Sequence, residues 1–383
     1  DLIFKDDLTV QQYERVQIML QIRQVEQARE AAEILIDDNL DLAESNPILF
    51  GKLLANLGTI LAYQEKYPEA MQALDVSLQT VEAASNPYTL TLKKIIMARG
   101  LVQTRLRLFE EAEGSFRRAQ HIAHRIGGVY TPDQLEVLRH LTRLNLKQGN
   151  LIDADREQVF SLRVTEQAYG ENSEELLPIL QRLGAYFASR GGMFSVSGGP
   201  DFRYFRDQMF RQSIKYYERA INIVEDNYGI NDLRLIEPLR GLARARLLQV
   251  TNRSASEAAL ERVVHIVDSN PVSDVADRVK AMISLGDMYT ITGDKRASGV
   301  YLSAWTLMQE DDAYRQLAAE VFGTPTRLHP NIDGIMYLDR IPDAAAGEDT
   351  ELFIDVAYSV LPNGRVSNIE LIEKNVPNAQ VRY

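Results

Sequence analysis

Small residues recur through this chain at a fixed interval of 42 residues. One series consists of Ala28, Ala70, Ala112 and Ala154. A second series with the same interval consists of Gly58, Gly100, Thr142 and Gly184, the first three of which each lie 12 residues before an alanine of the first series. Two series with one shared period indicate an array of similar units rather than a single globular core.

Each period has the pattern of two helices joined by a turn. In the second period, apolar residues have helical spacing on both sides of the turn, namely Leu53, Leu57 and Leu61 before it and Leu74 and Val81 after it. Pro68 marks the start of the second helix, because a missing N–H is tolerated in the first helical turn. A small residue near the middle of each helix lets the two backbones approach closely.

These residues resemble the tetratricopeptide repeat (TPR), whose signature places L-G-x-x-Y on one helix and A-x-x-x-F on the next. The matching segments are Leu57-Gly58-x-x-Leu61 with Ala70-x-x-x-Leu74, Ala112-x-x-x-Phe116, Leu183-Gly184-x-x-Phe187 and Leu285-Gly286-x-x-Tyr289. The 42-residue period resembles the longer repeats of kinesin-light-chain-like arrays. The resemblance implies an all-α, right-handed TPR solenoid whose first helices line a concave groove.

The array continues beyond Ala154 with one interruption. Ser213 lies 59 residues after Ala154, and Ala243 lies 59 after Gly184, so 17 extra residues enter the fifth unit. We place this insertion at about 190–209 and interpret its Gly-rich sequence as a flexible loop. In the sixth unit, the small residue of the second helix is expected to be Ala255 or Ala258. The expected helical hairpins cover 8–45, 46–87, 88–129, 130–171, 172–230, 231–272 and 273–312.

The predicted domain organisation follows from these boundaries. Residues 1–45 form a degenerate first hairpin with Val16 at the small position, and 46–312 form the main array. Helical spacing fades after residue 312, so 313–350 are expected to be a linker. Residues 351–383 are interpreted as a small β-hairpin element, because an alternating segment is followed by a turn with Asn363-Gly364 and a second alternating segment.

The C-terminal hairpin resembles the start of the TonB C-terminal domain. The likeness covers the strand from Phe353 to Val360, the turn Asn363-Gly364-Arg365 and the strand around Ile369–Glu373. It implies a bacterial periplasmic protein, with the cytoplasm as the alternative. Because the sequence begins at Asp1 and not at methionine, we expect a trimmed or processed chain, with any signal peptide or anchor upstream.

Composition excludes several classes of site. The chain of 383 residues has no cysteine, which removes thiolate metal sites, disulfides and cysteine nucleophiles. Its formal net charge of −12 argues against a nucleic-acid partner. No apolar segment is long enough to span a membrane. His121 and His124 are interpreted as solvated surface residues. We therefore expect no catalytic residues, no metal site and no cofactor.

Cationic residues gather at the expected groove positions of the first helices. The candidate partner-binding residues are Lys94, Arg105, Arg139, Arg143, Lys147, Arg240 and Arg244, with Lys52 and Lys280 at matching positions in other units. Arginine binds carboxylates through paired hydrogen bonds, so the groove is expected to bind a partner with acidic groups. The alternative is that these cations pair with carboxylates of neighbouring helices, such as Glu136 and Glu237.

The insertion provides a second candidate surface, formed by Phe202, Arg203, Tyr204 and Phe205. Exposed aromatic residues with arginine are typical of interaction hot spots, although the loop could also bury them.

The sequence favours a non-enzymatic scaffold that binds a peptide or protein in the TPR groove. One alternative is a TonB-type energy transducer, or its accessory, with the array as a spacer. Another is a ligand-binding sensor or an enzyme that uses the inserted loop.

Overall fold

The computed structural model describes residues 5–193, 200–249, 253–309, 314–323, 354–360 and 366–374. The chain divides into two compact parts, residues 1–328 and 329–383.

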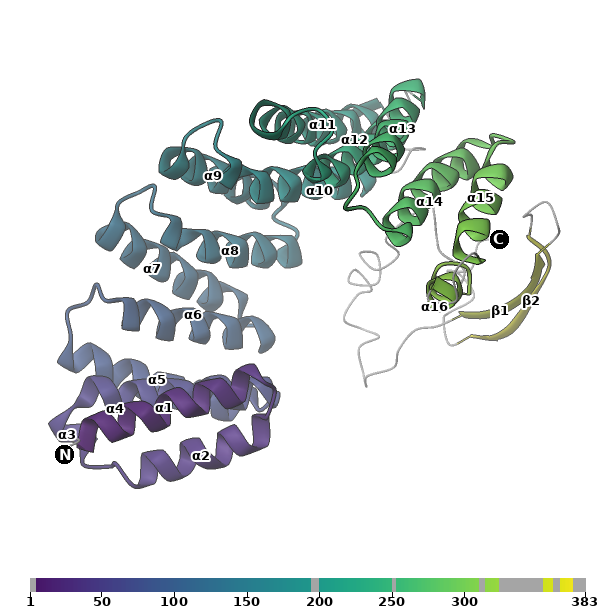
Figure 1. Cartoon of the computed structure of the whole chain (residues 1–383). Helices are drawn as coiled ribbons and strands as arrows, with labels where there is room; N and C mark the ends of the chain where they lie inside the picture. The colour runs from purple at the N-terminus through teal and green to yellow at the C-terminus, as the bar shows by residue number, and fades with distance from the viewer. Residues whose placement is uncertain are drawn as a thin grey trace. The chain divides into compact units, whose positions relative to one another are not determined.

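Consecutive antiparallel helix pairs, here called repeats, build the first part (Figure 1). The described residues contain seven: α1 (Lys5–Gln21) with α2 (Val25–Asp37), α4 (Pro47–Tyr63) with α5 (Tyr67–Ala84), α6 (Leu90–Arg105) with α7 (Phe109–Gly127), α8 (Leu135–Gln148) with α9 (Leu151–Tyr169), α10 (Leu177–Gly192) with α11 (Pro200–Tyr228), α12 (Ile236–Leu248) with α13 (Arg253–Ser269), and α14 (Val275–Thr292) with α15 (Ala297–Gln309).

Short helices connect or extend these repeats. They are α3 (Leu42–Ser45), α16 (Arg315–Phe322) and the 3₁₀ turns η1 (Pro132–Gln134), η2 (Glu174–Leu176) and η3 (Leu233–Leu235). Each 3₁₀ turn is capped by the residue before it: the side chains of Thr131, Ser173 and Asp232 each accept a hydrogen bond from the backbone N–H two residues later. Within a repeat the two helices pack together, and the second helix packs on the first helix of the next repeat. The expected all-α TPR-type array is confirmed.

The predicted small residues lie where the two helices of a repeat cross. Ala28, Ala70, Ala112, Ala154 and Ser213 on the second helices are all 0% exposed. The glycines opposite them leave no room for a side chain. A Cβ on Gly100 would lie 2.7 Å from the ring of Phe116, and a Cβ on Gly184 would lie 2.6 Å from the ring of Tyr217. The 42-residue register therefore records the points of closest helix contact.

Residue size at the crossing is balanced across the two helices. Gly58, Gly100 and Gly184 face a large residue four positions after the second-helix small residue, namely Leu74, Phe116 and Tyr217. In the first repeat the sizes are reversed, since Val16 packs in one apolar cluster with Ala32. Val16 is only 2% exposed, so the degenerate first repeat keeps the same crossing. Close packing requires this compensation, because interiors tolerate neither voids nor overlaps.

In the sixth repeat the expected small residue was wrong. Ala258 is exposed and Ala255 is half-buried, whereas Ser256 is fully buried at the crossing. The Ser256 hydroxyl donates a hydrogen bond to the Ala243 carbonyl at 2.8 Å, as Ser213 does to Gly184 at 2.7 Å. A serine fits here because its hydroxyl bonds the backbone of the facing helix.

The predicted loop at 190–209 was also wrong where the structure describes it. Residues 190–192 complete α10, and Pro200 begins α11, which runs for 29 residues to Tyr228. The extended start of α11 is held by Phe210, which packs on Gly191, and by buried Arg206, which donates to the Leu248 carbonyl at 3.3 Å. Residues 194–199 of the insertion lie outside the described residues.

The predicted linker at 313–350 begins with a helix instead. In α16, Ala318 is 4% exposed and packs in a cluster with Val279, Ala304 and Met308. This burial against α14 and α15 stabilises a helix too short to form alone. Residues 324–350 lie outside the described residues.

The second part contains two described strands, β1 (Ile354–Val360) and β2 (Val366–Lys374). They pair antiparallel, from Val360 opposite Val366 to Ile354 opposite Lys374, with two irregularities in register. The expected turn at 361–365 lies outside the described residues.

We predict that the crossing can be rebuilt in the reversed order of sizes. Gly100→Val should lower the free energy of unfolding by about 1–3 kcal/mol through overpacking against Phe116. Phe116→Ala should cost about 3–5 kcal/mol through the cavity it leaves. The double variant copies the Val16 and Ala32 arrangement and should be more stable than the sum of the single losses by at least about 0.5 kcal/mol. Urea denaturation of the four proteins measures the coupling, and strict additivity would contradict the size-compensation argument.

We also predict a stabilising glycine in the turn of the second repeat. Glu65 has φ +62°, and Arg23 and Arg107 have the same φ at the equivalent turn of the first and third repeats. In the fourth repeat this position is a glycine, Gly149. Because side chains are strained in this left-handed conformation, Glu65→Gly should raise the free energy of unfolding by about 0.5–1 kcal/mol. The control Gln72→Gly, at an exposed position within α5, should lower it by about 1 kcal/mol. A loss of stability in Glu65→Gly would show that the turn is unstrained.

Candidate functional site

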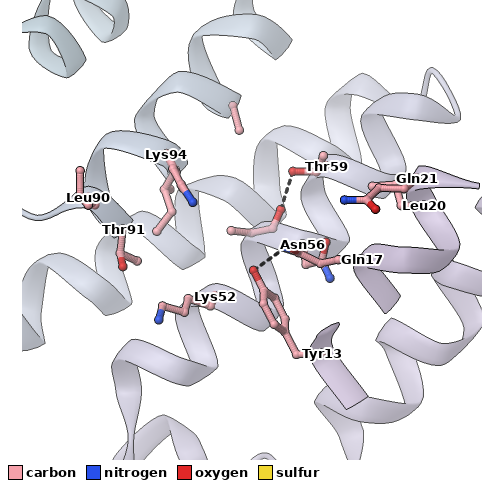
Figure 2. Close-up of a pocket in the computed structure, with 13 residues that line it drawn as sticks. Tyr13, Gln17, Leu20, Gln21, Lys52, Asn56, Thr59, Leu90, Thr91 and Lys94 are labelled. Carbon is pink, nitrogen blue, oxygen red and sulfur yellow. Dashed lines mark hydrogen bonds between the residues drawn. The ribbon is translucent and has the colours of Figure 1, made fainter. Parts of the chain in front are cut away.

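The first helices form one surface, which we call the groove face. With the small residue of the first helix as position 8, it consists of positions 2, 5, 6, 9, 12 and 13 of α1, α4, α6, α8, α10, α12 and α14. A pocket of about 530 Å³ opens on this face over α1, α4 and α6 (Figure 2). First helices of consecutive repeats contact each other directly at several points, including α4 with α6 and α10 with α12. The face therefore continues from α1 through α4 and α6 to α8, and from α10 to α12.

The pocket combines two cations with apolar and polar walls. Lys52 and Lys94 line it from neighbouring repeats, both at position 2. Asn56, at position 6, is 7% exposed and also lines it. On α1, Gln17 donates to the Tyr13 hydroxyl at 2.6 Å, which fixes both side chains at the pocket wall (Figure 2). The predicted groove residue Lys94 and its counterpart Lys52 thus share one cavity.

The other predicted groove cations lie along the same face. Arg139, Arg143 and Lys147 are exposed along α8, while Arg105 is exposed at the end of α6. On α12, Arg244 is exposed and Arg240 is half-buried. Arg182, at position 6 of α10, also belongs to this face. It was not predicted, because all the predicted groove cations stand at positions 2, 5, 9 and 13 of their helices.

The central cations influence one another. Desolvation, and next the charge of Arg139, lowers the pKa of the Arg182 guanidinium on the neighbouring first helix. The pKa of His140 is lowered mainly by burial, and the charges of Arg139 and Arg143 oppose the effect of Glu136. Like charges held this close without full compensation favour an anion over this part of the face.

Most groove cations have no carboxylate partner in the part of the chain that the structure describes. Among the described residues no carboxylate oxygen lies within 4.0 Å of Lys52, Lys94, Arg105, Arg143, Lys147, Arg182, Arg244 or Lys280. The alternative of pairing with neighbouring helices holds in part and only within a helix: Arg139 lies 4.0 Å from Glu136, and Arg240 lies 3.2 Å from Glu237.

Eight arginines elsewhere in the array pair with a carboxylate of the adjacent repeat. Distances run from 2.5 to 3.0 Å for Arg99 with Asp75, Arg117 with Glu157, Arg190 with Asp155, Arg246 with Glu218, Arg262 with Glu225 and Arg296 with Glu257. Arg118 with Glu82 and Arg219 with Glu166 form the same kind of contact. Carboxylates are thus used between repeats, and the groove face keeps its positive charge.

The aromatic candidates occupy a different surface. Phe202, Arg203, Tyr204 and Phe205 are exposed on the first turns of α11, with the three aromatic side chains 52–59% exposed. Tyr204 and Phe205 meet edge to face at 5.9 Å. Because α11 is a second helix, these residues do not extend the groove face, and the structure does not bring the two candidate surfaces together.

Neither metal nor membrane features stand out in the part of the chain that is described. There, no three His, Asp or Glu residues gather as a metal site would require. No helix within the same residues has the length and apolar character needed to cross a bilayer.

Comparison with known proteins gives likeness in fold only. No protein-family model matches the sequence, and no curated protein matches it. Similar solved structures include a TPR repeat-containing protein from Cytophaga hutchinsonii (TM-score 0.49, 11% identity, covering 82% of this chain and 100% of that one) and BtubC (BKLC) from P. vanneervenii (0.40, 17%, 76% and 96%). The apo quorum sensor NprR from B. thuringiensis is a third (0.41, 10%, 80% and 89%). By its own repeat register and helix packing, this chain is a TPR-type helical-repeat protein.

Proposed function

We propose that this protein is a non-enzymatic scaffold that binds an extended acidic peptide segment of a partner along its groove face. The observation that carries the proposal is the sorting of charge. Most cations on the groove face lack a carboxylate partner among the described residues, whereas several arginines at the contacts between repeats have one. In a chain of net charge −12, a cationic strip of this kind attracts acidic segments, which the rest of the acidic chain repels.

The spacing of the first helices sets the spacing of the ligand's charges. Helices in contact lie about 8–10 Å apart, and an extended peptide advances about 3.3 Å per residue. One repeat therefore corresponds to about three residues of ligand. A segment with an acidic residue at about every third position can place one carboxylate over each repeat.

The periplasmic location remains a prediction that rests on the TonB-like hairpin. Fractionation of the native cells, with detection of the protein in the periplasmic or the cytoplasmic extract, tests it independently of the binding proposal.

We predict that a fluorescent peptide with glutamate at every third position binds and that charge reversal on α8 weakens binding. Arg139→Glu with Arg143→Glu replaces attraction by repulsion and should raise Kd at least about tenfold. Fluorescence anisotropy measures Kd, and higher salt should weaken binding because the sites are exposed.

The matched control is Arg156→Glu with Arg211→Glu, which makes the same change in net charge at exposed positions of second helices. It should leave Kd within about twofold, because screened charges at a distance contribute little. Equal loss of binding in both double variants would show that only net charge matters, and failure of the wild-type protein to bind any acidic peptide would overturn the proposed function.

A further inference from the structure

Tyr217 passes between two first helices and ends at the groove face. It belongs to α11, and its ring packs on Gly184 of α10, in its own repeat. On the far side it meets Gly241 of α12, where a Cβ would lie 2.2 Å from the ring and 2.7 Å from the hydroxyl oxygen. Gly241 stands at position 6 of its helix. The absence of a side chain there lets the tyrosine hydroxyl take the place that a groove residue fills in other repeats.

In the third and fourth repeats, a side chain at position 6 covers the corresponding aromatic residue. Phe116 packs on Gly100 and then stacks on His140, at position 6 of α8, with ring centroids 5.5 Å apart. Phe116 ends in a ring carbon and His140 covers it. At Gly241 there is no side chain at position 6 to cover the ring end of Tyr217, so its hydroxyl lies against α12 at a groove position.

Donors without acceptors gather around Gly241. Tyr217 is 7% exposed, and its hydroxyl has no hydrogen-bond partner among the described residues. The Nε atom of Arg240 is buried and also lacks an acceptor, while its Nη1 donates to Glu237 at 3.2 Å. Buried polar groups in folded proteins are nearly always satisfied, so the Arg240 Nε calls for an explanation. The Tyr217 hydroxyl is not among the fully buried atoms without a partner, so it is open to water or to a ligand.

Arg244 adds a charge beside the same hydroxyl. It is exposed and has no carboxylate within 4.0 Å among the described residues. Arg244 stands three residues after Gly241 on the same helix, at position 9 of the face. Burial raises the pKa of Tyr217, the charge of Arg244 lowers it, and the carboxylate of Glu237, which Arg240 holds, raises it. Tyr217, Arg240 and Arg244 thus direct donor groups and positive charge to one spot on the face.

We propose that Tyr217, Arg240 and Arg244 form a subsite for one carboxylate of the bound peptide, with the Tyr217 hydroxyl and the guanidinium groups as donors. This inference rests on the proposed function and adds a fixed position to it. A phenol O–H and a guanidinium together bind a carboxylate more strongly than exposed charge alone, because charge-assisted hydrogen bonds have defined geometry. The subsite sets the register of the peptide on the array.

The test uses Tyr217→Phe, which keeps the ring between the two glycines and removes only the hydroxyl. For the peptide with glutamate at every third position, Kd should rise at least about tenfold, as expected for one lost hydrogen bond to a charged group. The midpoint of thermal unfolding should stay the same or increase, since an unpartnered hydroxyl is removed. The control Tyr216→Phe alters the neighbouring tyrosine, which stacks on Phe187 at 5.6 Å, and should leave Kd unchanged.

A double-mutant cycle identifies the carboxylate. Each glutamate of the peptide is replaced in turn by glutamine, and each peptide is titrated against wild type, Tyr217→Phe and Arg244→Gln. At one peptide position, the replacement of glutamate by glutamine should weaken binding to wild type but not to either variant. If Tyr217→Phe binds like wild type while charge reversal on α8 still weakens binding, the subsite is overturned and the proposed function stands. If wild type binds none of the peptides, the proposed function itself fails.

Discussion

The close crossing of two helices within each repeat is the constraint on which the structure depends. Where Gly100 or Gly184 faces its partner, a single methyl group would overlap an aromatic ring. The crossing holds the two helices at one angle and one depth, and that geometry positions the next repeat. Since each repeat buries its apolar residues only against its neighbours, an error at one crossing would be transmitted to the groove face built from successive first helices.

Charge follows from this geometry. Carboxylates on second helices, such as Asp75 and Asp155, lie where the next repeat presents an arginine. Acidic residues at the contacts between repeats therefore form ion pairs with those arginines. An exposed pair contributes little to stability, but a pair such as Arg190 with Asp155, where the arginine is 5% exposed, fixes how two repeats meet. The cations at the groove positions of the first helices mostly lie outside these contacts between repeats. Cations there remain available to a ligand, and the binding surface follows from what the interfaces leave unpaired.

The sequence predicts the repeat well because the crossing depends on residue size at fixed positions. Its period, Val16 as a substitute small residue and the cations of α8 and α12 all follow from that register. Features fixed by tertiary contacts were missed. Residues 200–209 read as a loop, yet burial of Arg206 and Phe210 extends α11 through them. Ala318 gives α16 a buried contact that no local pattern shows. Ser256 was not predicted as the small residue of the sixth repeat, because the search was for alanine, whereas a serine hydroxyl bonds the facing helix at that crossing.

Tyr217 could not be found from its own helix, since its role depends on Gly184 and Gly241 in two different first helices. The seventh repeat shows what the arrangement does when the chain supplies the acceptor. Tyr301 packs on Gly286, and its hydroxyl donates to Asp287 at 2.6 Å. Asp287 stands at position 9 of α14, in the same repeat as Tyr301. In the repeat of Tyr217, position 9 is Ala185, which offers no acceptor, and Arg244 holds position 9 of the following first helix, α12. The seventh repeat thus satisfies its tyrosine with its own carboxylate, whereas the fifth has none at that position, and in the proposed subsite a carboxylate of the ligand takes this role.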